Sequence, residues 1–475
     1  MFFKEFLIHE LKDNGSFQIV RTGIDSYTYN LYGFSKNKEI HVEKWYSWRS
    51  DNDVNELLSS VSTQLKLRLT DSNFIKQNLY LFNDEEYEHN TVGNFLDYVP
   101  GIGNQIENGL INTNNLVGYV NKKHNNTNYS IVISSRFGDN FLKHLIASTD
   151  GFLELPDSGD AGQTGMAEWL LTFLWKVKLK HAYRLGLPKE YVTKQEKTVS
   201  FRGNMNINGA IINPEFIPAY DCKFREHSYD NSITRLITNA FRLVRNKEIL
   251  QDCHKMRQDF NIATEGKRIP INELLDYKAV KNPYYNDYNK VAELSQRIIK
   301  KEMADFSSEK DDFSAFFFDM SMLFEHFIRK ALIRKGYVLE EKNKDQYSIP
   351  SGGVHNAGKW RLYPDIVIQN EDGSVDVFDV KYKQYNFIYG VDRDDLFQIN
   401  TYVAHILNTR LVRRCGFIFP LEAEQIIGKV NPKIHELNIA EKKVAFEIHF
   451  FEVPNDSCES YSIEFMNKVD KFYNN

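Results

Sequence analysis

The sequence predicts an α+β protein of several domains: a β-rich N-terminal region, a helical middle region and a C-terminal α/β domain with a mixed central sheet. The chain has 475 residues, more than the roughly 250–300 at which one hydrophobic core stops growing. Strand-like stretches dominate its start, helical patterns its middle, and helix, strands, helix and strand follow one another near its end. We therefore expect domains over residues 1–160, 161–310 and 311–475.

Composition excludes several classes of protein. The chain is 42% hydrophobic and 26% charged, with a formal net charge of −5, as in ordinary globular proteins. This mild acidity argues against a uniformly basic nucleic-acid binder, although a local basic groove can sit on an acidic chain. We expect no membrane span, since no run of about 18 apolar residues occurs, and the N-terminus lacks the pattern of a signal peptide.

The cysteines predict neither a zinc site nor a disulfide framework. They are far apart in sequence and form no Cys-x-x-Cys pair: Cys222, Cys253, Cys415 and Cys458. Free thiols are typical of a reducing compartment, so we expect a cytoplasmic protein.

The first 110 residues are rich in strand signals, such as SFQIVRTG and EIHVEKW, but carry no motif that identifies a function. A pair of strands is expected at 116–120 and 129–133, followed by a short helix from about residue 140.

Apolar periodicity predicts helices over 167–185, 232–244 and 285–305 in the middle region. The stretch VSFRGNMNI predicts a strand. Three arginines of the second helix either meet phosphates or, more ordinarily, form its solvated side: Arg235, Arg242 and Arg245.

The loop LPDSGDAGQTGM, residues 155–166, is rich in Gly and Asp but lacks the Gly-Lys-Ser/Thr ending of a phosphate-binding loop. A linker between domains is the favoured interpretation. We therefore do not expect this chain to hydrolyse nucleotides itself.

The C-terminal domain is expected to begin with a helix over 313–335 and to continue with a hairpin, YPDIVIQNEDGSVDVFDVKYK, over 363–383. Side chains alternate across a strand, so Asp379 and Lys381 share a face. A turn at residues 371–373 folds Asp365 back beside them. A helix over 394–408 and an apolar strand over 414–419 follow.

Two neighbouring carboxylates form a natural site for a hard divalent cation such as Mg²⁺. Such a cation lowers the pKa of a bound water and neutralises charge on a phosphodiester. The lysine two residues beyond Asp379 can orient that water or stabilise the transition state. The alternative is a surface hairpin with a salt bridge between strands, worth at most about 1 kcal/mol.

Two further features favour the metal site. Glu325, on the helix before the hairpin, is either a third acidic ligand or one half of an i,i+4 pair with Arg329. Gln398 and Tyr402 are four residues apart on the following helix, so they project from one side of it. They could hydrogen-bond a phosphate or Lys381. Otherwise they are a polar surface residue and a packed aromatic.

Together these residues make the domain resemble a PD-(D/E)xK nuclease of the RecB-like branch, whose additional motifs are a helical Glu and Q-x-x-x-Y. The strings FDMSMLFEHF, YPDIVI, FDVKYK and DLFQINTYVAH resemble the McrC family, the nuclease partner of the McrB GTPase in modification-dependent restriction. The resemblance spans roughly residues 112–420. It also includes GLPKEYVTKQEKTVSFRGNMNI. It departs at Ser135-Arg136-Phe137, where the family usually has Pro-Lys-aromatic.

The resemblance implies a role for each residue. Glu325, Asp365 and Asp379 would bind Mg²⁺, or Mn²⁺ in its place. Lys381 would be the catalytic lysine, supported by Gln398 and Tyr402. It also implies an endonuclease that cuts double-stranded DNA, with its modified bases read by the partner. That partner would be a hexameric AAA+ GTPase, docked on the β-rich N-terminal region and stimulated by it.

Two alternatives remain open at this stage. The chain could be mainly a scaffold and GTPase activator, although the complete Glu, Asp, Asp, Lys set argues against a dead site. It could also be a free-standing RecB-like repair nuclease, which would cut DNA without a motor.

Overall fold

The computed structural model divides the chain into two compact units, residues 1–156 with 315–475 and residues 157–314. It describes residues 5–21, 28–35, 38–47, 51–69, 79–80, 95–101, 108–124, 127–149, 166–205, 220–244, 248–267, 270, 274, 277–306, 313–341, 347–350, 359–422, 435–455, 458 and 460–472. The linker expected at 155–166 lies outside these residues except for Met166, which begins a helix, and Arg245 lies outside them as well. None of the described helices is long and apolar enough to cross a membrane.

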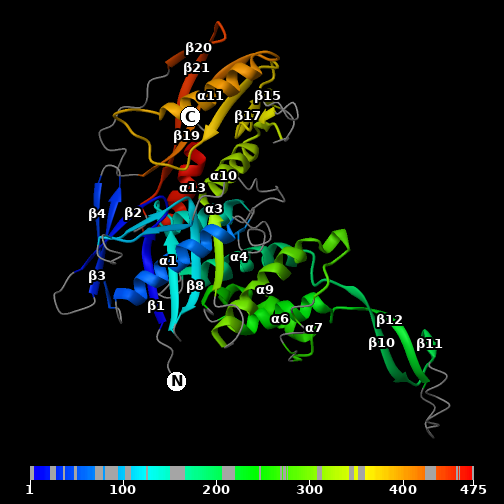
Figure 1. The fold of residues 1–475 in the computed structure, drawn as a ribbon. Coiled ribbons are helices and arrows are strands. Elements are labelled where there is room, and N and C mark those ends of the chain that lie inside the picture. Colours follow the sequence, from blue (N-terminus) through cyan, green and yellow to red (C-terminus); the bar gives the residue numbers. More distant parts are fainter. Residues whose placement is uncertain are drawn as a thin grey trace. The chain divides into compact units, whose positions relative to one another are not determined.

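The first unit begins with an antiparallel sheet (Figure 1). Its strands, in spatial order, are β4 (Lys38–Ser47), β3 (Thr28–Ser35), β2 (Ser16–Arg21), β7 (Leu110–Thr113) and β6 (Leu96–Val99). The helix α1 (Asp51–Arg68) packs beside β6, where the Ser62 hydroxyl accepts a hydrogen bond from the Tyr98 amide. This helix was missed by the strand-rich interpretation of the region.

A second sheet joins the N-terminus to the start of the C-terminal domain. Its order is β1 (Glu5–Lys12), β9 (Thr127–Ser134), β8 (Leu116–His124), β13 (Phe313–Asp319) and β5 (Leu79–Tyr80). The pair β8–β9 confirms the strands expected at 116–120 and 129–133. The helix α3 (Asp139–Thr149) follows as predicted.

The helix expected over 313–335 is wrong in its first seven residues. Phe313–Asp319 form β13, because the aromatic side chains of Phe316, Phe317 and Phe318 are buried within the sheet. Asp319 then caps α10 (Met320–Arg334), its carboxylate accepting from the amides of Ser321 and Met322.

The C-terminal sheet is mixed, as the sequence predicted. Its order is β14 (Val338–Leu339), β17 (Ile366–Gln369), β18 (Val375–Val380), β19 (Val412–Glu422), β21 (Lys442–Val453) and β20 (His435–Ile439). The strands β18, β19 and β21 run parallel, and the other pairs are antiparallel. A short ladder, β15 (Ser348–Pro350) with β16 (Lys359–Arg361), stands apart from this sheet.

Helices cover both faces of the C-terminal sheet (Figure 1). On one face, α11 (Arg393–Ile406) packs Ile399 and Val403 into a core with Val377 of β18. On the other, rings of α3, α10 and α13 (Tyr461–Phe472) meet Phe451 of β21: Phe141, Phe324, Phe327 and Phe465. The central strand β18 is therefore buried at every position.

The second unit is mainly helical. Its described residues form four α-helices of ten residues or more, which pack around Trp175, Phe241, Phe260 and Tyr288. These helices are α4 (Met166–Tyr183), α6 (Ser232–Leu243), α7 (His254–Ala263) and α9 (Asp287–Phe306). A three-stranded sheet extends away from them (Figure 1): β10 (Glu190–Thr198), β12 (Tyr220–Ser228) and β11 (Asn204–Met205). Within the described residues 199–205, the strand expected from VSFRGNMNI is present only as β11.

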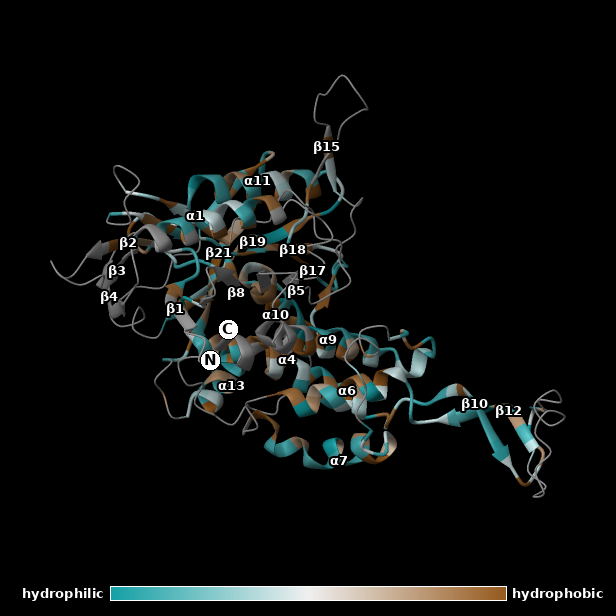
Figure 2. Cartoon of the chain, turned by 60° about the horizontal axis from the view of Figure 1, so that its bottom comes forward, coloured by the Kyte–Doolittle hydropathy of each residue, from teal (hydrophilic) through white to brown (hydrophobic). Residues whose placement is uncertain are grey.

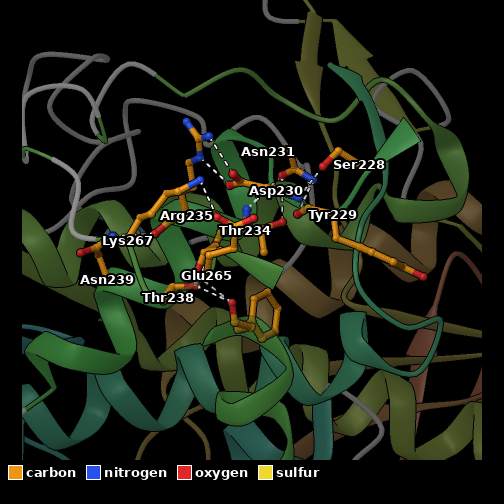
Figure 3. Close-up of polar contacts among 12 residues, drawn as sticks. Ser228, Tyr229, Asp230, Asn231, Thr234, Arg235, Thr238, Asn239, Glu265 and Lys267 are labelled. Atoms are coloured by element: carbon orange, nitrogen blue, oxygen red, sulfur yellow. Dashed lines mark hydrogen bonds and ion pairs between the residues drawn. The ribbon is translucent and has the colours of Figure 1, made fainter. Parts of the chain in front are cut away.

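The arginines of α6 make contacts within the protein, and those at the start of the helix are drawn in Figure 3. Asn231 caps the helix through the amide of Thr234, and Arg235 makes a two-pronged ion pair with Asp230. Arg242 donates to the carbonyls of Gly266 and Lys267. Both arginines therefore hold the fold together. The helix α6 is amphipathic: it carries both hydrophilic and hydrophobic residues, and one side of it is buried (Figure 2).

We predict that Gly416→Ala destabilises the C-terminal sheet by about 3 kcal/mol, because it inserts a methyl group between two central strands. A Cβ on Gly416 would lie 1.7 Å from the carbonyl oxygen of Glu447 on β21. Gly373→Ala is the control. It meets nothing within 4 Å and strains only the turn, at φ +78°, so it should cost about 1 kcal/mol. Urea unfolding measures both, and equal losses would contradict the clash.

Candidate active site

The hairpin of β17 and β18 brings two aspartates together. Its register pairs Ile366 with Phe378, and one further step sets Asp365 opposite Asp379. The Oδ2 atom of Asp365 accepts a hydrogen bond of 2.8 Å from the Val380 amide, which fixes this carboxylate at the end of β18. The expected turn is present, with Gly373 at positive φ.

Strand alternation places the carboxylate of Asp379 under α11. Val375 and Val377 lie on the same side of β18 and belong to the core that α11 covers. Asp379 is 1% exposed, so its charge lies within this core and not on a solvated edge. The surface hairpin considered from the sequence is therefore not what the structure contains.

Lys381 connects the hairpin to α11. Its Nζ atom lies 2.7 Å from Asp379 Oδ2 and donates to Gln398 Oε1 at 2.8 Å. Gln398 in turn donates from Nε2 to the Tyr402 hydroxyl at 2.7 Å. The contact expected between Gln398 and the lysine is thus present, and the two helical residues form a chain behind it.

Asp395 is a member of this cluster that the sequence analysis did not single out. Its carboxylate lies 3.4 Å from Lys381 Nζ and also pairs with Lys383. The sequence did carry a signal, because Asp395 precedes Gln398 by three residues and so lies on the same side of the helix.

Burial and charge raise the pKa of Asp379 to about 7. Desolvation is the largest cause, and the neighbouring charge of Asp365 adds to it, whereas the Lys381 ammonium opposes both. Near neutral pH the Asp379 carboxyl is therefore poised between its protonated and charged forms. A cation beside it would favour the charged form.

The lysine and the tyrosine keep their protons. Burial disfavours the Lys381 ammonium, but the charges of Asp379, Asp395 and Asp365 outweigh it, and the pKa of Lys381 lies above its ordinary value. Burial raises the pKa of Tyr402 to about 12, and the two hairpin carboxylates reinforce this. Lys381 can thus donate hydrogen bonds and positive charge, but it is not a base at neutral pH.

The residues fit a hard divalent cation. Asp379 Oδ2 is buried and, although it lies 2.7 Å from Lys381 Nζ, no described group makes an aligned hydrogen bond to it. Mg²⁺ binds through one or two carboxylates and keeps several waters, and Asp365 with Asp379 supply two. Within the described residues no three acidic, histidine or cysteine side chains form a ready metal cage.

Glu325 is placed by α10, where it is half-buried. One turn later on the same helix, Arg329 donates to the backbone carbonyls of Asp365 and Glu340. The guanidinium is therefore directed at the hairpin backbone, and the side of α10 that carries Glu325 is directed toward Asp365. The contacts above join Asp365, Asp379, Lys381, Gln398 and Tyr402, whereas Glu325 is placed only by its position on α10, one turn before Arg329.

The other face of the hairpin is supported by the Ser135-Arg136-Phe137 segment. The Ser135 hydroxyl and the Tyr382 hydroxyl lie 2.8 Å apart, and the Arg136 guanidinium stacks 4.8 Å above the Tyr382 ring. The backbone and side chain of Arg136 both donate to Asp13, at the end of β1. The segment that departs from the family pattern thus braces the residue next to Lys381.

A second buried aspartate on β18 has a structural explanation. Asp376 is fully buried on the face opposite Asp379, where it accepts hydrogen bonds from Arg413 and Arg414. Burial would raise the pKa of Asp376, but these hydrogen bonds hold it below its ordinary value. The pKa shifts of the two aspartates on this strand therefore have opposite directions, lowered for Asp376 and raised for Asp379.

Fold and site define a mixed α+β protein with an acid–lysine cluster at the end of a central strand. The chain belongs to the family described as McrBC 5-methylcytosine restriction system component, whose model matches residues 111–420. This confirms the family resemblance seen in the sequence. No curated protein matches the chain.

Two solved structures are similar to the chain, both from Thermococcus gammatolerans. One is a half-complex of the tetradecameric assembly of McrB AAA+ hexamers with bound McrC, with 16% identity, a TM-score of 0.48, and coverage of 88% of this chain and 95% of that one. The other is the McrBC complex, with 15% identity, a TM-score of 0.36, and coverage of 71% and 90%.

We predict that Asp379→Asn stabilises the metal-free protein by about 2 kcal/mol at pH 8. The pKa of Asp379 is higher in the folded than in the unfolded chain. Its contribution to the free energy of unfolding therefore falls as the pH rises from the unfolded pKa of this carboxyl toward about 7. The amide has no proton to lose, so its advantage should be smaller at pH 5. Urea unfolding with a chelator measures this.

The matched control is Asp376→Asn on the same strand. Its lowered pKa predicts the opposite sign, a loss of stability that is nearly equal at pH 8 and pH 5 and becomes smaller only as the pH falls below the ordinary value of 3.8. If Asp379→Asn destabilised the protein at pH 8 as Asp376→Asn does, the assigned electrostatics would be wrong.

We predict that Arg136→Met destabilises the first unit by about 3 kcal/mol, because it leaves the buried Asp13 carboxylate without its cation. Burial already raises the pKa of Asp13 against the opposing effect of Arg136. The double variant Asp13→Asn with Arg136→Met should recover part of the loss in urea unfolding. A double variant at least as unstable as Arg136→Met would contradict the pairing.

Proposed function

We propose that this chain is the endonuclease subunit of an McrBC-like restriction complex, a PD-(D/E)xK enzyme that hydrolyses DNA phosphodiester bonds with Mg²⁺. The observation that carries this is the buried Asp379 carboxylate opposite Asp365, with the Lys381 ammonium 2.7 Å away. A salt bridge that only stabilised the fold would need one carboxylate for the lysine. A second carboxylate beside the first adds repulsion. Membership of the restriction-system family supports the same conclusion.

Asp365 and Asp379 would hold the cation, with Glu325 approaching from α10. When bound, Mg²⁺ would supply a Lewis acid and a more acidic water. The protein's own residues do the positioning. Tyr402 fixes Gln398, Gln398 fixes the Lys381 ammonium, and the ammonium presents positive charge and hydrogen bonds to the phosphate as negative charge develops on it.

Asp395 would set the charge balance of this site. It pairs with Lys381 and Lys383, so it keeps the two ammonium groups in place on the α11 side of the hairpin. Without it, Lys381 could swing wholly toward the metal ligands and compete with the cation. We therefore propose that Asp395 is a positioning residue.

We further propose a partner, an AAA+ GTPase hexamer of the McrB type. The family description names a component of a larger system, and one of the two Thermococcus structures holds McrB AAA+ hexamers with bound McrC. This chain would dock that hexamer through its N-terminal domain, residues 1–160, and stimulate the GTPase. The substrate would be double-stranded DNA with modified cytosine, read by the partner in the cytoplasm.

We predict that Lys381→Ala and Asp379→Asn each lower DNA cleavage at least about 100-fold, because each removes a group that acts on the reacting phosphate or its cation. The measurement is cleavage of methylated plasmid with Mg²⁺, GTP and the partner. Stimulation of the partner's GTPase should persist in both variants. Lys443→Ala, at an exposed ion pair far along the sheet, is the control and should cut normally.

The same assay decides between the candidate functions. If both active-site variants cut DNA at the wild-type rate, the remaining function for this chain would be that of a scaffold and GTPase activator. Full cutting by the wild-type chain alone, with no partner or GTP, would point to a free-standing repair nuclease.

A further inference from the structure

A short tip between the hairpin and α11 exposes two large apolar side chains. Ile388 is 83% exposed and Tyr389 is 86% exposed, more than any other large hydrophobic side chain in the described part of the chain. They are adjacent in sequence and follow Lys381 by seven and eight residues. We call residues 386–390 the tip.

The tip has a defined shape. The side-chain oxygen of Asn386 accepts hydrogen bonds from the amides of Ile388 and Tyr389, at 2.9 and 3.1 Å. The Gly390 amide donates to the Asn386 carbonyl at 2.8 Å, and Gly390 adopts φ +76°, which a side chain would strain. The two apolar side chains are thus presented to solvent by a closed turn.

The base of the tip is anchored to the sheet and to α11. Tyr385 and Phe387 pack against the ring of Phe450 on β21, and Tyr385 also meets Phe419 on β19. Lys383 pairs with both Asp392 and Asp395, closing the segment across its ends. The exposure of the tip is therefore a property of an anchored element.

The same contacts place the tip beside the candidate active site. Asp395 touches both Lys383 and the site lysine, Lys381. Tyr389 is three residues from Asp392, a backbone span of at most about 11 Å. Since a DNA strand advances about 3.4 Å per nucleotide, a strand of a few nucleotides is long enough to pass from Asp392, at the base of the tip, to Tyr389.

We infer that the tip contacts the bases of the DNA substrate next to the scissile phosphate, with Tyr389 stacking on a base and Ile388 wedged beside it. This rests on the proposed function, and it names how the substrate is held there. Aromatic rings stack on bases of any sequence, and apolar side chains wedge between base steps. Residues 386–390 contain no lysine or arginine, so the tip offers apolar and aromatic contacts that suit bases rather than phosphates.

A second exposed aromatic side chain lies on α11. Phe397 is 54% exposed and immediately precedes Gln398, and the Arg393 guanidinium lies 5.0 Å from its ring centroid. A second exposed aromatic side chain therefore lies on the helix that orients Lys381. A substrate strand lying along the tip and α11 would contact the catalytic cluster as well.

The test is DNA binding by the full-length chain in the Asp379→Asn background, which does not cut. Duplexes of about 30 base pairs carry 2-aminopurine at successive positions. The variants are Ile388→Ser with Tyr389→Ser, and Tyr389→Phe. Ile463→Ser on α13, where Ile463 is 62% exposed, is the matched control. All three positions are exposed, so none of these changes removes a core contact.

The expected result is a fluorescence change at a few adjacent positions, lost in the double serine variant together with about tenfold weaker binding. Tyr389→Phe and Ile463→Ser should behave as the Asp379→Asn parent. Parent-like binding and fluorescence in the double variant would overturn the inference. If that variant instead stimulated the partner's GTPase less, the tip would belong to the protein interface.

This outcome is separable from that of the proposed function. A wild-type chain that fails to cut with its partner refutes the nuclease, whatever the tip does. Normal cutting with normal base contacts in the double serine variant refutes the tip alone.

Discussion

The site depends on one electrostatic constraint, two carboxylates held opposite each other at the buried end of β18 with a single lysine between them and α11. Taking Asp379 out of water is costly, and Asp365 makes it costlier, so the lysine offsets only part of the repulsion. The two carboxylates stay this close together only because contacts from the surrounding elements hold the chain in place. A cation that enters between the two carboxylates would relieve their repulsion. Its binding would therefore stabilise the folded state.

The surroundings act from both faces of the sheet. On the α11 side, Gln398 and Asp395 hold the Lys381 ammonium. On the opposite side, Ser135 and Arg136 hold Tyr382, the next residue along the chain. The segment that follows β9 therefore contacts the chain directly after β18. A partner docked on the N-terminal region would have a short physical route to the site.

Much of this site could be predicted because its signals are local. Alternation put Asp379 with Lys381, and helical spacing put Gln398 with Tyr402. The helix α1 was also readable, since Leu58, Val61 and Leu65 repeat at three and four residues and are all buried. Its omission was an error of interpretation. The contact of Asp13 with Arg136 had no such signal, because the two are 123 residues apart and meet only through the pairing of β1 with β9.

The most direct test of the central claim is metal binding itself. Mn²⁺ titrated into the full-length chain at pH 8 and followed by electron paramagnetic resonance should show a bound population in the wild type. Asp365→Asn and Asp379→Asn should each lose it, while the exposed-surface variant Ile463→Ser keeps it. Bound Mn²⁺ at wild-type affinity in both aspartate variants would contradict the account, because the carboxylates would then not be the ligands.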